Sequence, residues 1–204
     1  MKSIDLWIKN LKKNRINGYS LSNRKELFPL LESFLFRDAV IGSGDSVTLE
    51  ELKVFDFLRN GPYHFLDKFD PGLSKQEKKQ LYRQNFMADI FFTGVNALTM
   101  DGDIFNIDGN GSRVAPMLYG PDKVIMIAGR NKMTKDLSEA VFRTRNIAAP
   151  LDADRLGKNT PCHTLRRCVD CEHKERFCND FITIAGQFDE NRMHVILIDE
   201  DLGY

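Results

Sequence analysis

The chain has 204 residues, enough for one large domain that buries roughly 70% of its unfolded surface. Its 29 basic and 29 acidic side chains balance, so charge gives no reason to expect nucleic acid or an anionic membrane as a partner. The apolar runs are shorter than the ~18 residues of a membrane span and the N-terminus lacks a signal-peptide core, so we expect a cytoplasmic protein.

The first third of the chain alternates helices with short strands. Apolar residues at helical spacing predict a helix over residues 4–16, and a glycine then opens a short strand. A second helix follows Ser22 or Asn23 as its N-cap, and residues 39–41 are a buried strand. Thr48 begins a pattern typical of a capping box, which predicts the start of the next helix.

The middle of the chain continues the same alternation. A capping box at Ser74 opens a helix that ends near residue 87. Asp101 and Gly102 form the turn of a hairpin. Strands alternating with helices predict an α/β fold with a mostly parallel sheet covered on both faces. The strands expected in this part are residues 63–66, 89–93, 97–99, 104–107 and 123–128.

The last third is predicted to contain a helix, a loop and two strands. The helix covers residues 134–147, and prolines 150 and 161 bracket the loop that follows. Residues 181–185 and 194–198 are predicted to pair as closing strands. The side chains expected to face inward from the helix are Leu137, Val141 and Phe142.

All four cysteines fall within 17 residues, at the spacing C-x5-C-x2-C-x6-C. The central pair places two thiolates on one turn of backbone, and the flanking thiolates can complete a tetrahedron around a metal. Two disulfides are the alternative, which a reducing cytosol disfavours. We expect residues 159–180 to bind a [4Fe–4S] cluster or, alternatively, Zn²⁺; the single C-x2-C pair slightly favours iron–sulfur. The expected ligands are Cys162, Cys168, Cys171 and Cys178.

A glycine-rich loop at residues 42–46 is the first candidate anion site. It follows a buried strand and precedes a helix whose free N–H groups suit a carboxylate or phosphate. A plain capped turn is the alternative, and Asp45 would repel an anion unless it points away. The candidate contacts are Gly42, Ser43, Gly44, Ser46 and Thr48.

Residues 93–113 are the second candidate, the densest polar and glycine-rich region of the chain. Arg113 can grip a carboxylate with two parallel hydrogen bonds, so it is the predicted anchor of a small organic acid. The aspartates here can instead simply cap turns. Lys132 follows another strand at the edge where α/β sheets bind ligands, although a solvated loop lysine is the commoner outcome. The candidate contacts are Asn96, Asp108, Gly109, Asn110, Gly111, Arg113 and Lys132.

Several of these elements together resemble one family. The runs IGSGDSVTLEEL, ADIFFTGVNALTMDGDIFNIDGNGSRVAP, GRNKMTKDLSEAV and NIAAPLDADRL and the cysteine tail are similar to the LUD family of lactate-utilisation proteins. Within it, the chain resembles a cysteine-containing bacterial branch related to the LutC/YkgG-type subunit. The resemblance implies one domain over residues 1–204 with a three-layer α/β/α fold. That fold is similar to NagB, ribose-5-phosphate isomerase and the CoA transferases.

The resemblance also implies a function. It implies a component of an iron–sulfur system that oxidises L-lactate to pyruvate, acting with other lactate-utilisation subunits and binding a small anionic metabolite such as lactate. Two alternatives stay open: a non-catalytic metabolite-binding or regulatory protein with structural zinc, and a CoA-transferase-like or isomerase-like enzyme. For such an enzyme, Glu50 and Asp101 are the candidate general bases, judged only by their nearness to the two loops. Whether the chain forms a homodimer is left open.

Overall fold

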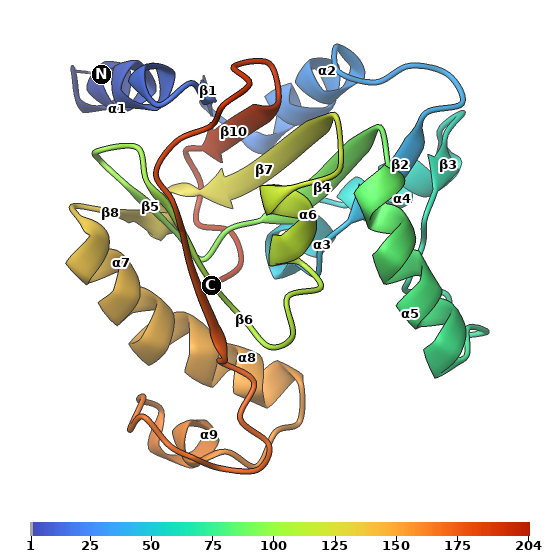
Figure 1. Ribbon diagram of the computed structural model, residues 1–204. Coiled ribbons are helices and arrows are strands. Elements are labelled where there is room, and N and C mark those ends of the chain that lie inside the picture. The colour runs from blue at the N-terminus through green and yellow to red at the C-terminus, as the bar shows by residue number, and fades with distance from the viewer. Residues whose placement is uncertain (1) are drawn as a thin grey trace.

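The computed structural model describes residues 2–204 and is built on a six-stranded sheet (Figure 1). The strand order is β1-β10-β7-β4-β2-β3, and every neighbouring pair is parallel, which confirms the predicted sheet. The central strands β4, β7 and β10 are buried on both faces, which explains their nearly continuous apolar runs. The strands are β1 (Asn17–Leu21), β2 (Val40–Ser43), β3 (His64–Phe65), β4 (Ile90–Gly94), β7 (Lys123–Gly129) and β10 (Met193–Ile198).

A second sheet of four strands, in the order β8-β5-β6-β9, was not predicted. The hairpin at Asp101 and Gly102 is confirmed, because β5 and β6 pair antiparallel around it. The expected pairing of residues 181–185 with 194–198 is wrong: β9 pairs with β6, whereas β10 lies between β1 and β7. The loop between β9 and β10 carries the chain from one sheet to the other. These strands are β5 (Ala97–Thr99), β6 (Ile104–Asp108), β8 (Met133–Thr134) and β9 (Asp180–Ile184).

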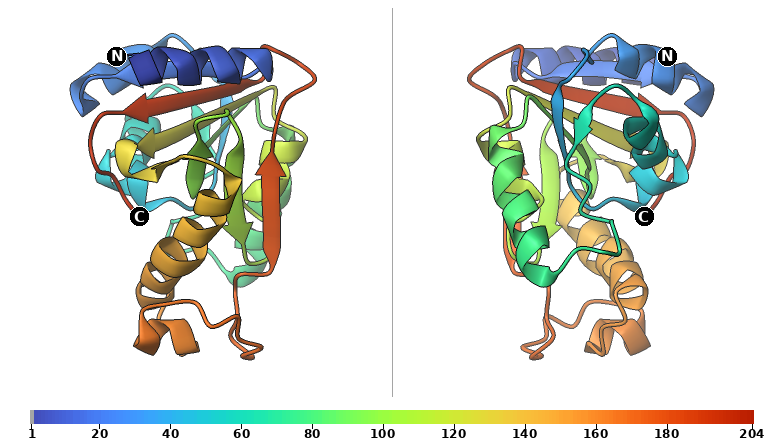
Figure 2. Two further views of the ribbon diagram at one scale, coloured as in Figure 1. Left: turned by 90° about the vertical axis from the view of Figure 1, so that its left-hand side faces the viewer. Right: turned by 90° about the vertical axis from the view of Figure 1, so that its right-hand side faces the viewer.

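Helices and the second sheet cover the two faces of the parallel sheet, giving three layers (Figures 1 and 2). One buried cluster joins α2, α3 and α4 to the sheet, and the other joins α1, α6 and the second sheet to its opposite face. Alternate residues of β7 show the division, because Ile125 belongs to the first cluster and Met126 to the second. The helices are α1 (Lys2–Lys13), α2 (Leu27–Glu32), α3 (Val47–Glu51), α4 (Val54–Asn60), α5 (Lys75–Gln84), α6 (Val114–Leu118), α7 (Leu137–Arg143), α8 (Ala149–Arg155) and α9 (Pro161–Leu165).

The two predicted capping boxes have different outcomes. The one at Ser74 is confirmed in full at the start of α5. The one at Thr48 is wrong, because α3 begins two residues earlier and Ser46 is its N-cap, accepting a hydrogen bond from the N–H of Leu49 at 3.3 Å. Thr48 is buried within the helix, where its hydroxyl contacts the carbonyl of Leu202 at 3.2 Å. Its side chain is therefore committed to tertiary packing.

The helix predicted over residues 134–147 begins at Leu137 and continues through a π-helical turn, Thr144–Ala148, directly into α8. Pro150 therefore lies inside a helix, and the wider bonding of the π turn suits a residue that has no N–H to donate. The inward orientation is wrong for Leu137, which is 38% exposed, and for Phe142, which is 64% exposed. Val141 is partly buried against the second sheet. The inward face instead carries small and polar side chains, Ala140, Arg143 and Thr144.

The cysteine segment lies at the far end of α8, away from the parallel sheet (Figures 1 and 2). It contains α9 and loops, and the chain then returns to the second sheet through β9. Among residues 2–204, no helix is both long and apolar enough to cross a membrane.

Candidate functional site

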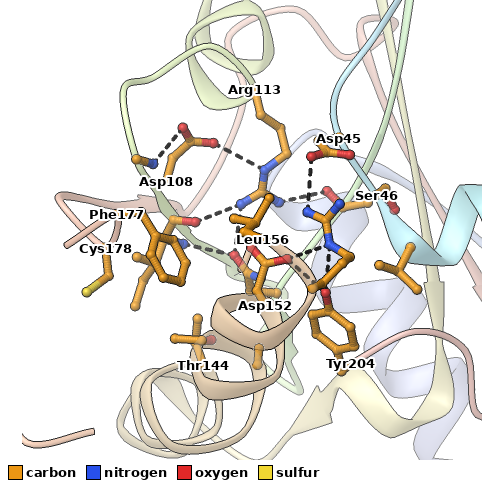
Figure 3. Close-up of a pocket in the computed structure, with 18 of the residues that line it drawn as sticks. Asp45, Ser46, Asp108, Arg113, Thr144, Asp152, Leu156, Phe177, Cys178 and Tyr204 are labelled. Carbon is orange, nitrogen blue, oxygen red and sulfur yellow. Dashed lines mark hydrogen bonds and ion pairs between the residues drawn. The ribbon is translucent and has the colours of Figure 1, made fainter. Parts of the chain in front are cut away.

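A cavity of about 370 Å³ lies at the carboxyl ends of β2, β4 and β7, where open α/β sheets bind ligands (Figure 3). The chain reaches it from the loop after β2, from the end of β4, from the loop after β6 and from α8. Seven of the twelve predicted anion-binding residues line it: Ser46, Asn96, Asp108, Gly109, Asn110, Arg113 and Lys132. The other five, which do not line it, are Gly42, Ser43, Gly44, Thr48 and Gly111.

The glycine loop after β2 has mainly a packing role. Gly42, Ser43 and Gly44 are buried. A side-chain carbon on Gly44 would lie 2.6 Å from Thr93 Oγ1 and 2.7 Å from Arg113 Cγ, closer than real contacts allow. Glycine is therefore required for Arg113 to cross this loop, and the loop's own contribution to the cavity is Asp45 and Ser46.

Arg113 organises the cavity wall through five hydrogen bonds. Nη1 donates to Asn106 Oδ1 at 3.0 Å and to the carbonyl of Gly94 at 3.5 Å. Nη2 donates to Asn96 Oδ1 at 2.9 Å and to the carbonyl of Ile107 at 2.8 Å. The fifth bond, from Nε, goes to Asp108. Every N–H of the guanidinium thus has a protein acceptor, so a ligand carboxylate would have to displace one of them.

Asp108 both closes a turn and pairs with this arginine. Its Oδ1 accepts from the N–H groups of Gly109, Asn110 and Gly111 at 2.8, 3.2 and 3.0 Å. Its Oδ2 accepts from Arg113 Nε at 3.2 Å. Asp108 therefore caps the turn, as the alternative prediction had it. The capped turn places Gly109 and Asn110 in the cavity wall.

Lys132 lies at the cavity and is only 4% exposed. Its Nζ donates to Thr48 Oγ1 at 2.8 Å, a contact that turns Thr48 into a support for the lysine. Arg143 packs nearby and donates to the backbone carbonyls of Asn131 and Asn96, both at 2.8 Å. Burial first, then the charges of Arg143 and Arg113, lower the pKa of Lys132 to about 7. The sequence did not reveal this depth, because a lysine after a strand is usually solvated.

Within residues 2–204, each carboxylate of the cavity wall contacts an arginine, and no ion pair involves Lys132. Arg155 pairs with Asp45 at 3.1 Å and with Asp152 at 2.8 Å. The pairing with Arg155 offsets the negative charge of Asp45, which would otherwise repel an anion. Lys132 is the lining cation that has no ion pair among these residues, although the charge of Glu51 acts on it from beyond ion-pair distance and partly opposes the lowering of its pKa.

Asp152, Arg155 and Tyr204 form a hydrogen-bonded group on one side of the cavity (Figure 3). The Tyr204 hydroxyl donates to Asp152 Oδ1 at 2.8 Å and accepts from Arg155 Nε at 2.9 Å. Burial and the Asp152 carboxylate raise the pKa of Tyr204, so it keeps its proton at neutral pH. None of the three is among the candidate contacts predicted from the sequence, although Asp152 and Arg155 lie in the run NIAAPLDADRL, which carries part of the family resemblance.

The cysteine segment supplies another part of the wall through Arg176, Phe177 and Cys178. Arg176 donates to the carbonyls of Cys171 at 2.8 Å and Cys178 at 3.1 Å, so it holds the segment together where it meets the cavity. The segment is therefore part of the site.

The four cysteines are free thiols whose chemistry fits a thiolate-bound metal centre. Burial raises the pKa of Cys178, and the charges of Cys168 and Cys171 add to this rise while Arg176 opposes it. Arg145 donates to Cys168 Sγ at 3.3 Å and can offset thiolate charge. Cys162 is buried in α9 and contacts Thr160 at 3.2 Å. Among residues 2–204, no three potential ligands are arranged to hold a metal ion, so metal binding by this set stays a prediction.

Neither candidate general base reaches the cavity. Glu50 is exposed on α3, and Asp101 is exposed in the hairpin turn between β5 and β6. An isomerase-like or transferase-like reaction in this cavity has no support from either carboxylate.

Fold and site together define a three-layer α/β/α protein with a polar cavity at the carboxyl edge of its parallel sheet. The LUD domain family matches residues 4–198, and the chain belongs to this family. The predicted membership and the predicted fold class are thereby confirmed.

Solved structures match this chain at low sequence identity. A DUF162 family protein from Deinococcus radiodurans matches with a TM-score of 0.53 at 13% identity, covering 97% of this chain and 96% of that one. Ribose 5-phosphate isomerase from Plasmodium falciparum has a TM-score of 0.34 at 14% identity, covering 55% and 52%. The eIF2B beta protein from Chaetomium thermophilum has a TM-score of 0.37 at 14% identity, covering 57% and 44%. The curated proteins contain no match.

Proposed function

We propose that this protein is a component of a lactate-utilisation system and binds a small organic acid, such as lactate, in the cavity. The observation that supports the proposal best is Lys132. Burying an ammonium group without an ion-pair partner is costly, and an acid bound beside it would supply a carboxylate in contact. The arginines of the wall already have protein partners, so they shape the cavity and Lys132 is the group left to bind the anion.

Charge linkage follows from this arrangement. A carboxylate beside the ammonium of Lys132 favours the charged form and raises its pKa above 7. Binding therefore takes up protons when the free protein is above that pH, and the acid binds most tightly below it.

Calorimetric titration with L-lactate and pyruvate tests the proposal. We expect both acids to bind and to raise the melting temperature, since specific ligands stabilise the native state. Lys132→Met should weaken binding at least about tenfold, which corresponds to roughly 1.4 kcal/mol. Lys135→Met is the matched control, because Lys135 is exposed and lies outside the cavity wall. Absence of binding by both acids would overturn the proposal.

The second part of the proposal assigns a [4Fe–4S] cluster to Cys162, Cys168, Cys171 and Cys178. Such a cluster, when bound, supplies a one-electron carrier. Oxidation of lactate to pyruvate releases two electrons and two protons, so further carriers are needed, which supports a role with other subunits. Iron and acid-labile sulfide in anaerobically purified protein, with visible absorbance that dithionite bleaches, would support the cluster. One zinc ion and no iron would instead support the structural-zinc alternative.

A further inference from the structure

Two buried lysines lie near the cavity, and their surroundings differ. Lys68 does not line the cavity, and its Nζ lies 5.1 Å from the centre of the Phe69 ring and 5.6 Å from that of Tyr82. Aromatic faces stabilise an ammonium ion. Lys132 has no ring over it in the described residues and lines the cavity directly. Of the two, Lys132 is therefore the lysine that a ligand in the cavity can meet.

The contacts of Lys132 are compatible with a free amine. Thr48 Oγ1 lies 2.8 Å from Nζ, and the Thr48 hydroxyl gives its own proton to the carbonyl of Leu202 at 3.2 Å. Thr48 therefore accepts from Lys132, which leaves the lone pair of an uncharged amine free for a ligand. The cations Arg143 and Arg113 lie nearby, and lysines are activated as nucleophiles by burial and by neighbouring positive charge.

We propose that Lys132 Nζ condenses with the carbonyl carbon of a 2-oxo acid in the cavity to form an imine. The inference rests on the proposed function, because it uses the same cavity and the same class of acid. A 2-oxo acid is the two-electron oxidation product of a 2-hydroxy acid, so a cavity sized for lactate also accepts pyruvate.

The condensation is balanced and needs no oxidant or reductant. The amine nitrogen bonds to the carbonyl carbon, and the carbonyl oxygen leaves as water after taking up protons from the amine and from solvent. The product is an iminium ion, whose positive charge lies beside the carboxylate of the bound acid. The ammonium form of Lys132 binds the anion, and the amine form attacks the carbonyl; a lysine that titrates near neutral pH supplies both.

Reductive trapping tests the proposal on the whole chain. The protein is incubated with pyruvate and sodium cyanoborohydride, then analysed by intact mass and peptide mapping. We expect one reduced pyruvate adduct, located on Lys132, and its loss in Lys132→Arg, which keeps the positive charge. Lys68→Met should retain the adduct.

The pH profile separates this site from ordinary lysines. With a pKa of about 7, the amine fraction of Lys132 rises about tenfold between pH 6 and pH 8. The amine fraction of a surface lysine rises about a hundredfold over the same range. Adducts spread over surface lysines with the steeper profile, or no adduct at all, would overturn the proposal.

Failure here is distinguishable from failure of the proposed function. L-lactate has no carbonyl to condense, so its binding without a pyruvate adduct would overturn the imine and keep the acid site. An adduct on Lys132 in a protein that does not bind L-lactate would support the imine and count against lactate as the ligand.

Discussion

Replacing Lys132 by methionine should stabilise the protein and remove part of its pH dependence. Methionine has a similar length and fills the same space without a charge. The native protein must bury Lys132 at 4% exposure beside two arginines, whereas the unfolded chain leaves it in water. The unfolded state therefore holds the proton more tightly than the folded state.

The size of the effect follows from the two pKa values. Lysine titrates at 10.5 in the unfolded chain and at about 7 in the folded protein. Below pH 7 Lys132 is protonated in both states, so it does not change the unfolding free energy with pH. Between the two pKa values the unfolded state binds more protons than the folded state, so the unfolding free energy rises with pH. The full gap between the two pKa values corresponds to roughly 5 kcal/mol of stability, and roughly 3 kcal/mol of it falls between pH 6 and pH 9.

Urea unfolding of the reduced, metal-free wild-type and Lys132→Met proteins at pH 6, 7, 8 and 9 measures this directly. Other titrating groups, including Lys68, occur in both proteins and cancel in the difference. We expect the stability advantage of Lys132→Met to shrink by about 2–3 kcal/mol from pH 6 to pH 9. A difference that stays constant across this range would refute the reasoning.

Four other outcomes are expected. Arg113→Met should lower the unfolding free energy by about 3–5 kcal/mol, because it leaves a buried carboxylate and several acceptors unpaired; a loss below about 1 kcal/mol in urea would contradict this. Phe142→Ala should cost less than about 1 kcal/mol, whereas fully buried Leu98→Ala should cost about 2–5 kcal/mol. Equal losses would contradict the orientation of α7. Cys171→Ser should remove metal from anaerobically purified protein and preserve its far-UV circular dichroism, so global unfolding would argue against a local role. The affinity for L-lactate should fall up to tenfold per pH unit above about 7, as Lys132 loses its proton; calorimetry showing no change would exclude Lys132 as the anion contact.

The parallel sheet was predictable because its central strands are apolar on both faces. Strands β4 and β7, for example, are mostly hydrophobic along their length, and hydropathy alone detects such runs. The second sheet was harder, since β9 alternates intermediate and exposed residues and pairs with a strand far away in sequence. Local pattern carries no information about that partner.

The sequence identified many of the residues that line the candidate site, but it predicted what those residues contact less well. Polar residues after strands identified Ser46, Asn96 and Lys132, because the carboxyl ends of parallel strands share one edge. The sequence predicted that Arg113 binds the ligand, but in the structure its hydrogen bonds go to protein acceptors. Those acceptors come close to Arg113 only when the chain folds. The buried face of α7 was misread because Arg143 is polar, although its side chain reaches backbone carbonyls inside.

The segment between α8 and β9 connects a helix of the cavity wall to a strand of the second sheet. Asn179 ties it to the turn after β6, with its N–H on the carbonyl of Asp108 and its side chain on that of Gly109, both at 2.9 Å. Shortening the segment would thus remove Arg176 and Phe177 from the wall and detach β9 from the loop that orders Arg113. Because Arg176, Phe177 and Cys178 belong both to the cysteine segment and to the cavity wall, losing the segment in evolution would change the cavity as well.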